Sequence, residues 1–308
     1  MPYYAAADGT RLAYRETGTG PPLICLPGGP MRAGEYLGDL GGLNAHHRLL
    51  VPDLRGTGAS AVPQDPASYR CDRLAEDIEA LRRHLGLDTA DLLAHSAGAN
   101  LAVRYLQAYG GRVDALVLVT PSPLAVGLHV TARERAAAVR PRRTRPWYPQ
   151  AVAALGRIVA GEASEADWDA AGPLYYQRWD ETARAHWEAE ERQTNERAAE
   201  VFVSEGAFDP PAARAVLAAR TAPSLVLAGE TDPGGGPALA DAYTALLPRA
   251  RPAETVVQRG AGHYPWLDDP DGFVSAVAGF LARAAAEAAR PRPGTSTPHA
   301  FVPTRPEE

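Results

Sequence analysis

The segment that most constrains this chain is a serine between an apolar run and a helical pattern. Residues 92–98 read LLAHSAG, so Ser96 follows a strand-like run and has Ala94 and Gly98 two residues away on either side. Small residues there allow a sharp turn from a strand into a helix, which lifts the serine hydroxyl out of the sheet. Such a turn predicts a nucleophile and acyl transfer through a serine ester. A serine that only caps a helix is the alternative, so the prediction depends on partner residues elsewhere.

Two later strand-like runs are each followed by a candidate partner. Residues 224–229 precede Asp232, and residues 254–257 precede a glycine-rich approach to His263. Both side chains follow the carboxyl ends of predicted strands, where open parallel sheets place their active sites. A nucleophilic serine needs an imidazole to accept its proton and a carboxylate to hold that imidazole. We therefore predict a triad of Ser96, Asp232 and His263.

Other acidic and histidine residues are weaker candidates for these roles. Glu230 is the nearest rival to Asp232, but it lies closer to the end of the strand. His95 is adjacent to the nucleophile, and its side chain is expected to point away from the serine hydroxyl and to pack within the turn. The remaining histidines have no comparable setting and are interpreted as surface or core residues: His46, His47, His84, His129, His186 and His299.

An early loop can supply a donor to the oxyanion of the tetrahedral intermediate. Residues 22–26 read as a strand, and residues 27–30 read PGGP, where glycine allows the backbone to approach a substrate. Serine-ester chemistry uses two N–H donors, one of them from the residue after the nucleophile. We predict that these donors are the backbone N–H groups of Gly29 and Ala97. A plain turn at residues 27–30 is the alternative.

Together these motifs resemble the α/β-hydrolase superfamily over nearly all of residues 1–285. Residues 52–60, PDLRGTGAS, resemble the D-x-R-G-x-G-x-S turn after the second core strand of that superfamily, and the chain order serine, aspartate, histidine is also its order. The resemblance implies an α/β fold in which helices flank a mostly parallel central sheet and a helical cap is inserted.

Two segments resemble proline iminopeptidases within that superfamily. Residues 27–30 are similar to their H-G-G-P-G loop, and residues 186–188, HWE, are similar to a cap Trp–Glu pair whose carboxylate binds the amino group of the substrate. This resemblance implies that Gly28, Trp187 and Glu188 contact substrate, while a solvent-facing Glu188 is the alternative.

The turn around Ser96 reads AHSAG, which is closer to general esterases and amidases. An esterase, thioesterase or lactone hydrolase of specialised metabolism is therefore a second hypothesis. A third is a ligand-binding protein that keeps the fold but performs no catalysis, because a fold does not determine a function.

The distribution of patterns along the chain predicts a core with one insertion. Strand and helix patterns alternate to residue 120, and they resume at residue 216, which predicts a core of residues 1–120 and 216–289. Residues 121–215 read as helical and hold Trp147, Trp168, Trp179 and Trp187 of the chain's 5 tryptophans, as in a cap. Residues 290–308 are rich in proline and predict a disordered tail.

Charge and composition exclude several classes of protein. The formal net charge is −6, which is not the basic excess of a nucleic-acid-binding protein. We expect a cytoplasmic protein, because no secretory signal or apolar stretch of transmembrane length is visible. The 2 cysteines predict no disulfide framework. The expected partner is a small-molecule or short-peptide substrate, with no metal and no cofactor, and the oligomeric state is left open.

Overall fold

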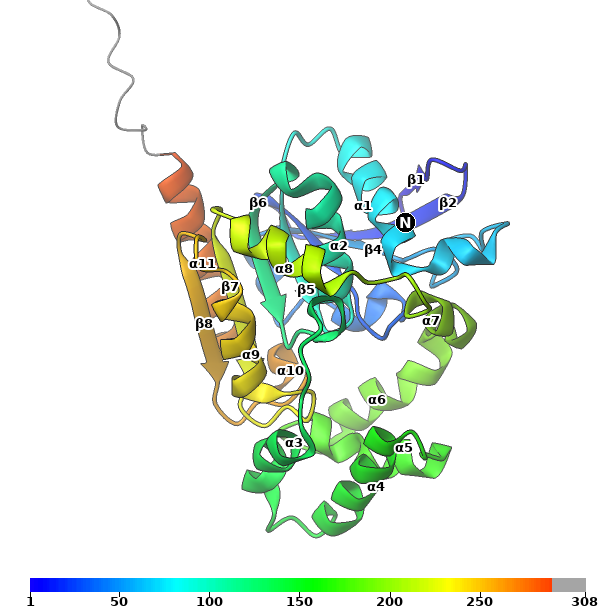
Figure 1. The fold of residues 1–308 in the computed structure, drawn as a ribbon, viewed down its shortest axis with the longest axis vertical. Coiled ribbons are helices and arrows are strands. Elements are labelled where there is room, and N and C mark those ends of the chain that lie inside the picture. Colours follow the sequence, from blue (N-terminus) through cyan, green and yellow to red (C-terminus); the bar gives the residue numbers. More distant parts are fainter. Residues whose placement is uncertain (290–308) are drawn as a thin grey trace, which may run out of the picture.

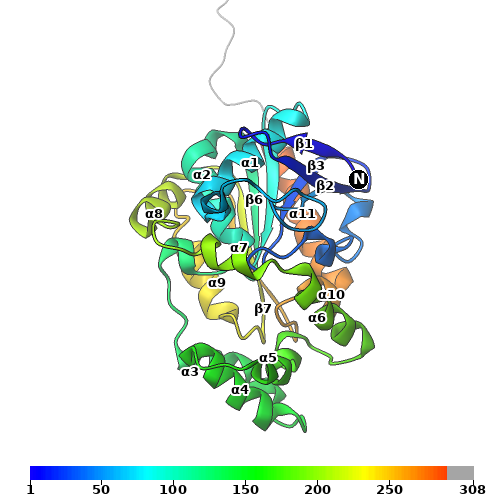
Figure 2. The same ribbon diagram turned by 90° about the vertical axis from the view of Figure 1, so that its right-hand side faces the viewer.

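A mixed β-sheet runs through the centre of the molecule (Figures 1 and 2). The computed structural model describes residues 1–289, and the predicted disordered tail at 290–308 lies outside the described residues. Within that range the sheet has 8 strands in the order β1-β2-β4-β3-β5-β6-β7-β8. The first two pairings are antiparallel, and β4 to β8 run parallel in that order. The strands are β1 Tyr3–Ala5, β2 Arg11–Thr17, β3 Pro22–Leu26, β4 Arg48–Pro52, β5 Ala90–His95, β6 Val113–Val119, β7 Ser224–Gly229 and β8 Ala253–Gln258.

Helices cover both faces of the sheet because its central strands are apolar on both sides. In β5, Leu92 and Leu93 point to opposite faces, and both have 0% exposure. The main helices are α1 Cys71–His84, α2 Gly98–Tyr109, α3 Ala132–Val139, α4 Tyr148–Ala160, α5 Glu165–Ala171, α6 Glu181–Gln193, α7 Glu196–Phe202, α8 Pro210–Ala219, α9 Gly236–Ala245, α10 Pro265–Asp268 and α11 Pro270–Ala288. No helix in the described part of the chain is both long enough and apolar enough to span a membrane.

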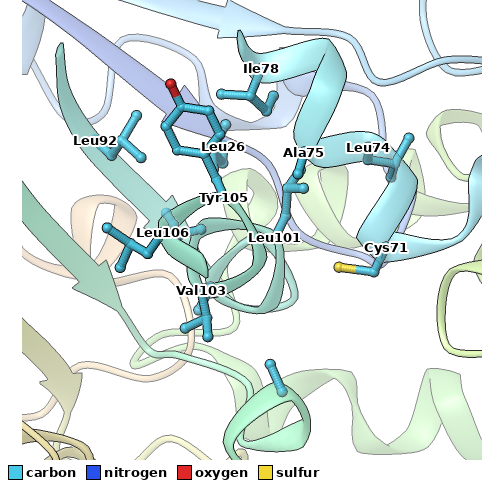
Figure 3. Close-up of a cluster of buried hydrophobic side chains, with 14 of the residues drawn as sticks. Leu26, Cys71, Leu74, Ala75, Ile78, Leu92, Leu101, Val103, Tyr105 and Leu106 are labelled. Atoms are coloured by element: carbon cyan, nitrogen blue, oxygen red, sulfur yellow. The ribbon is translucent and has the colours of Figure 1, made fainter. Parts of the chain in front are cut away.

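Two large hydrophobic clusters hold these layers together. One joins Leu26 and Leu92 of the sheet to α1 and α2, where Leu74 and Tyr105 are buried (Figure 3). The other lies on the opposite face, where Phe280 and its neighbours on α11 pack on the sheet. The serine turn between β5 and α2 is therefore anchored on both sides. The predicted mostly parallel central sheet flanked by helices is confirmed.

Helices α3 to α6 stand apart from the sheet, beyond the ends toward which β6 and β8 point (Figure 1). Val139, Ala151, Leu155 and Leu174 form a separate small cluster among them. The predicted boundary at residue 215 falls inside α8, which packs against α2 in the core cluster. The boundary stays a prediction, because α8 has a helical pattern like that of the insertion while its packing is with the core.

Candidate active site

A strained turn carries Ser96 between the end of β5 and the start of α2. Ser96 has a φ of 52°, in the left-handed region that residues other than glycine rarely adopt. Close packing surrounds the turn: a Cβ added at Gly98 would lie 2.5 Å from the carbonyl oxygen of Leu26, and one at Gly28 would lie 2.9 Å from Cβ of Ser96. The small residues at these positions are therefore required by the close approach of β3 and its following loop.

The structure brings together the three side chains that the sequence indicated. Oγ of Ser96 lies 2.9 Å from Nε2 of His263, and Nδ1 of His263 lies 3.0 Å from Oδ1 of Asp232. Because a carboxylate only accepts, Nδ1 carries the proton and Nε2 is free to accept the serine proton. The side chain of Asp232 is 4% exposed and that of His263 is 13% exposed. This geometry is that of a nucleophile, a base and an orienting acid.

Hydrogen bonds from several elements fix the two loops that hold Asp232 and His263. The backbone N–H of His263 donates to the carbonyl of Tyr175 at 2.7 Å, and its own carbonyl accepts from Oγ1 of Thr120 at 3.0 Å. The backbone N–H of Gly234 donates to Oδ1 of Asp232 at 2.8 Å. The rival Glu230 is exposed and accepts from the N–H of Gly260, so it is not directed at His263.

A relay of hydrogen bonds beneath the serine turn links two loops through His95. The N–H of Gly28 donates to Oη of Tyr36 at 2.6 Å, and that hydroxyl donates to Nδ1 of His95 at 2.7 Å. Nε2 of His95 in turn donates to the carbonyl of His263 at 3.0 Å. Burial, reinforced by the charge of His263, lowers the pKa of His95, which keeps its ring neutral. Tyr36 was not identified from sequence because nothing around it marks it as part of this relay.

The two predicted oxyanion donors lie beside the serine. A Cβ at Gly28 would approach the backbone nitrogen of Ala97 to 3.2 Å, so the loop at residues 27–30 lies against the residue after Ser96. Gly29 lines the same cavity as Ser96. Within residues 1–289, the N–H groups of Gly29 and Ala97 donate to no other group, whereas that of Gly28 is engaged by Tyr36. Two donors thus remain available next to the hydroxyl.

A cavity of about 330 Å³ opens in front of Ser96 between the core and the cap. Its size is near the lower end of the range for small-molecule sites. A larger depression of about 940 Å³ lies elsewhere, where Asp91 and Asp114 lie at the amino ends of β5 and β6. The cavity at Ser96 is the candidate site because Ser96 and His263 both line it. Its wall includes the following cap residues: Arg135, Trp168, Tyr175, Trp187 and Glu190.

Of the three predicted substrate contacts, Trp187 lies in the cavity wall, whereas Gly28 and Glu188 do not. Trp187 lines the cavity, and its ring lies 5.3 Å from that of Tyr175. Glu188 is exposed and is not part of the cavity wall. The carboxylate in the wall belongs to Glu190, three residues after Trp187 and therefore on the same side of α6. Helical spacing from Trp187 is the signal that could have identified Glu190.

Glu190 does not face the cavity as an isolated negative charge. Its Oε2 lies 3.1 Å from Nη1 of Arg32, which is 1% exposed. Arg32 also donates from Nε to Oε1 of Gln193 at 2.8 Å and from Nη2 to the carbonyl of His186 at 2.8 Å. This buried arginine therefore ties the loop after β3 to helix α6 and neutralises the carboxylate.

Residues 1–289 contain no arrangement of side chains that is suited to bind a metal ion. No group of three or more His, Cys, Asp or Glu side chains in that range is placed to hold a metal ion. The 2 cysteines, Cys25 and Cys71, are both buried and unpaired within the described residues.

Comparison with known proteins identifies a family. A family model described as the alpha/beta hydrolase fold matches residues 21–270. A non-heme haloperoxidase of Rhodococcus erythropolis is 34% identical over 125 residues, which are 40% of this chain and 45% of that protein. A proline iminopeptidase of Heyndrickxia coagulans is 32% identical over 108 residues, or 35% of this chain and 38% of that protein. The matched segments thus span less than half the length of these relatives.

Solved structures match over a larger part of the chain. The crystal structure of an esterase from Rhodococcus sp. ECU1013 superimposes with a TM-score of 0.68 at 25% sequence identity, and the match covers 91% of this chain and 98% of that one. The likeness therefore includes the cap region as well as the core, whereas the sequence relatives match only a segment.

Proposed function

This chain belongs to the α/β-hydrolase fold family, and on that premise we propose that it is a serine hydrolase that cleaves a carboxylic ester through an acyl-enzyme intermediate. The observation that carries the proposal is the continuous geometry from the hydroxyl of Ser96 through His263 to Asp232, with separations of 2.9 and 3.0 Å, at the wall of a cavity.

The proposed reaction has two halves. Oγ of Ser96 attacks the substrate carbonyl while its proton passes to Nε2 of His263, and the N–H groups of Gly29 and Ala97 bind the resulting oxyanion. The tetrahedral intermediate collapses, the bond to the leaving group breaks, and His263 protonates that group. Water then attacks the acyl-enzyme, again with His263 as base, and the acid product leaves with the serine hydroxyl restored. Asp232 stabilises the imidazolium in both halves.

The cavity favours a small acyl compound as substrate. Its volume of about 330 Å³ and its aromatic cap residues suit a compact ester, thioester or lactone. The likeness to a Rhodococcus esterase over nearly the whole chain supports the same class. The proposed role of the cap, α3 to α6, is to select that compound.

An amide hydrolase of the proline-iminopeptidase type is the second candidate. It is supported by the glycines at positions 28 and 29, by the similarity to iminopeptidases, and by a carboxylate in the cavity wall, that of Glu190. The ion pair between Glu190 and Arg32 counts against it, because a substrate amine would have to compete with a buried guanidinium.

Active-site labelling tests the nucleophile. A fluorophosphonate probe is expected to label the wild-type protein and to fail with Ser96→Ala. Labelling should persist in Ser122→Ala, a serine of the same cavity whose hydroxyl accepts from Nδ2 of Asn100 and has no hydrogen bond to an imidazole. Absence of wild-type labelling together with tight ligand binding would support the non-catalytic alternative instead.

Substrate profiling separates the two hydrolase candidates. Short acyl esters of 4-nitrophenol are expected to turn over, and aminoacyl anilides are not. If only the anilides react, and if Glu190→Gln removes that activity while the exposed Glu188→Gln does not, the iminopeptidase candidate replaces the esterase.

A further inference from the structure

One arginine in the cavity wall has no acidic partner among residues 1–289. Arg135, on cap helix α3, lines the same cavity as Ser96. Its Nη1 donates to the carbonyl of Pro233 at 2.7 Å, next to Asp232 in sequence. Its Nε is buried and has no hydrogen-bond partner, and within residues 1–289 its Nη2 donates to no group and the side chain forms no ion pair.

Nearby carboxylates are engaged elsewhere. Glu134, the adjacent residue, accepts from the N–H and the hydroxyl of Thr131 as part of the cap of α3. Glu190 pairs with Arg32, and Asp232 accepts from His263 and from the backbone of Gly234. Because the charges of Arg32 and Glu190 cancel, the guanidinium of Arg135 contributes one unbalanced positive charge to the cavity wall.

Buried arginines of this protein donate to acceptors that are carboxylates in some cases and carbonyl or hydroxyl oxygens in others, as for Arg142 and Arg220. Arg55 is 4% exposed and lies against Asp77 and Asp8, and Arg82 is 6% exposed and lies 2.7 Å from Glu79. An enclosed guanidinium N–H without an acceptor is unfavourable, because it has lost water and gained no partner. Arg135 has such an unpaired N–H group, and its side chain lines the same cavity as Ser96.

We propose that Arg135 binds a carboxylate of the substrate, so that the enzyme acts on small esters or lactones that carry a negative charge. The inference rests on the function proposed above for Ser96. With Nη1 held by Pro233 and Nε buried, Nη2 is the remaining donor of the guanidinium, and a charge-assisted hydrogen bond from it suits a carboxylate oxygen. One surplus charge matches a carboxylate better than a dianionic phosphate.

The cavity is small enough for one molecule to place its ester group at Ser96 and its carboxylate at Arg135. Arg135 and Ser96 line a single space of about 330 Å³, so a ligand that fills this space can contact both residues. Burial raises the pKa of Tyr175, and the nearby charge of Arg135 acts in the opposite direction.

Matched substrates test the inference. The mono(4-nitrophenyl) ester of adipic acid carries a carboxylate, and its methyl ester is neutral but otherwise alike. Arg135→Gln is expected to lower the ratio of kcat/KM for the anionic over the neutral substrate by at least about tenfold, as for a lost charge-assisted hydrogen bond. Arg135→Lys should retain part of the ratio. Arg133→Gln, an exposed arginine on the same helix, should leave the ratio unchanged.

A binding measurement separates this inference from the proposed reaction. With Ser96→Ala, calorimetry should show monomethyl adipate binding more tightly than dimethyl adipate, and adding Arg135→Gln should remove the difference. Equal binding of the two esters would overturn the carboxylate site while leaving the hydrolase in place, and so would an equal fall of both substrates in Arg135→Gln. Arg135-dependent binding without labelling of Ser96 would support the site and overturn the reaction.

Discussion

Ser96 occupies a backbone conformation that its own side chain disfavours, and the neighbouring residues explain why it stays there. Its φ of 52° is maintained by β5 on one side and α2 on the other, both packed in the core. Strain of this kind persists only where the surroundings over-determine the geometry. The consequence is a hydroxyl aimed at an imidazole rather than at the sheet.

The conformation of the serine turn depends on the absence of a side chain at Gly98. In Gly98→Ala the new Cβ would lie 2.5 Å from the carbonyl oxygen of Leu26 and 2.7 Å from that of Pro27, both backbone atoms. We expect a loss of about 1–3 kcal/mol in the free energy of unfolding, because overpacking forces the backbone to shift. We also expect kcat/KM for an ester to fall more than tenfold, since the shifted loop carries Gly29. Chemical denaturation and steady-state kinetics measure the two effects.

Gly156, within α4, is the matched control for that substitution. A Cβ there meets nothing within 4 Å, so Gly156→Ala should leave activity unchanged and raise stability by about 0.5–1 kcal/mol through helix propensity. Equal behaviour of the two variants would contradict the account of the serine turn.

At the residue scale, sequence patterns carry more information on the position of a side chain than on its orientation. The order and the preceding strands of Ser96, Asp232 and His263 are local features, and the structure brings these side chains within hydrogen-bond distance. Glu188 lies outside the cavity wall, and a resemblance of three letters says nothing about which side of a helix faces the cavity. Arg135 could not be found, because its role depends on a contact with a loop 98 residues away.

At the scale of elements, local pattern and long-range packing contribute differently. The apolar strand, turn and helix of residues 90–109 could be predicted because each local preference agrees with the fold. The limits of the insertion could not, because α8 reads as helical either way and only its contact with α2 assigns it to the core. Helix α6 is one of the elements through which the insertion meets the core, and α3 is another.

The contact of α6 with the core contains a histidine that predicts an acid sensitivity. Nε2 of His186 donates to the carbonyl of Tyr36 at 3.2 Å, and its Nδ1 accepts from the hydroxyl of Tyr176 at 2.7 Å. Burial, and then the charge of Arg32, lowers the pKa of His186 from 6.5 to about 4. The folded protein therefore keeps this ring neutral at a pH where the unfolded chain protonates it.

Because the folded pKa lies below the unfolded one, the stability that depends on neutral His186 is complete above pH 6.5 and is lost as the pH falls toward 4. We expect the wild-type free energy of unfolding to decline across this window by about 2–3 kcal/mol more than that of His186→Gln. Denaturation at a series of pH values measures the difference. His129→Gln, at an exposed position, should follow the wild-type slope; the same slope in all three proteins would contradict the assignment.

At the scale of the whole molecule, the cap is a small structure beside a large one. Its own cluster of buried residues, Val139, Ala151, Leu155 and Leu174, is separate from the two clusters that hold the sheet between its helices. Fewer buried apolar contacts mean a lower free energy for local opening. The cap is therefore expected to open without unfolding of the sheet, which provides a route for substrate into the cavity.

Two leucine-to-alanine substitutions distinguish local from global opening. Leu155 in the cap is 5% exposed and Leu225 in β7 is 0% exposed, and each truncation should remove about 2–5 kcal/mol of local stability. We expect Leu155→Ala to accelerate amide hydrogen exchange in residues 132–175 while the strands keep their protection. It should also lower kcat/KM, because Tyr175, which accepts from the N–H of His263, is carried by that region. Leu225→Ala should lower protection throughout the sheet. If Leu155→Ala instead accelerates amide hydrogen exchange equally in the cap and in the sheet, the two parts unfold as one cooperative unit. Substrate must then enter the cavity without opening of the cap.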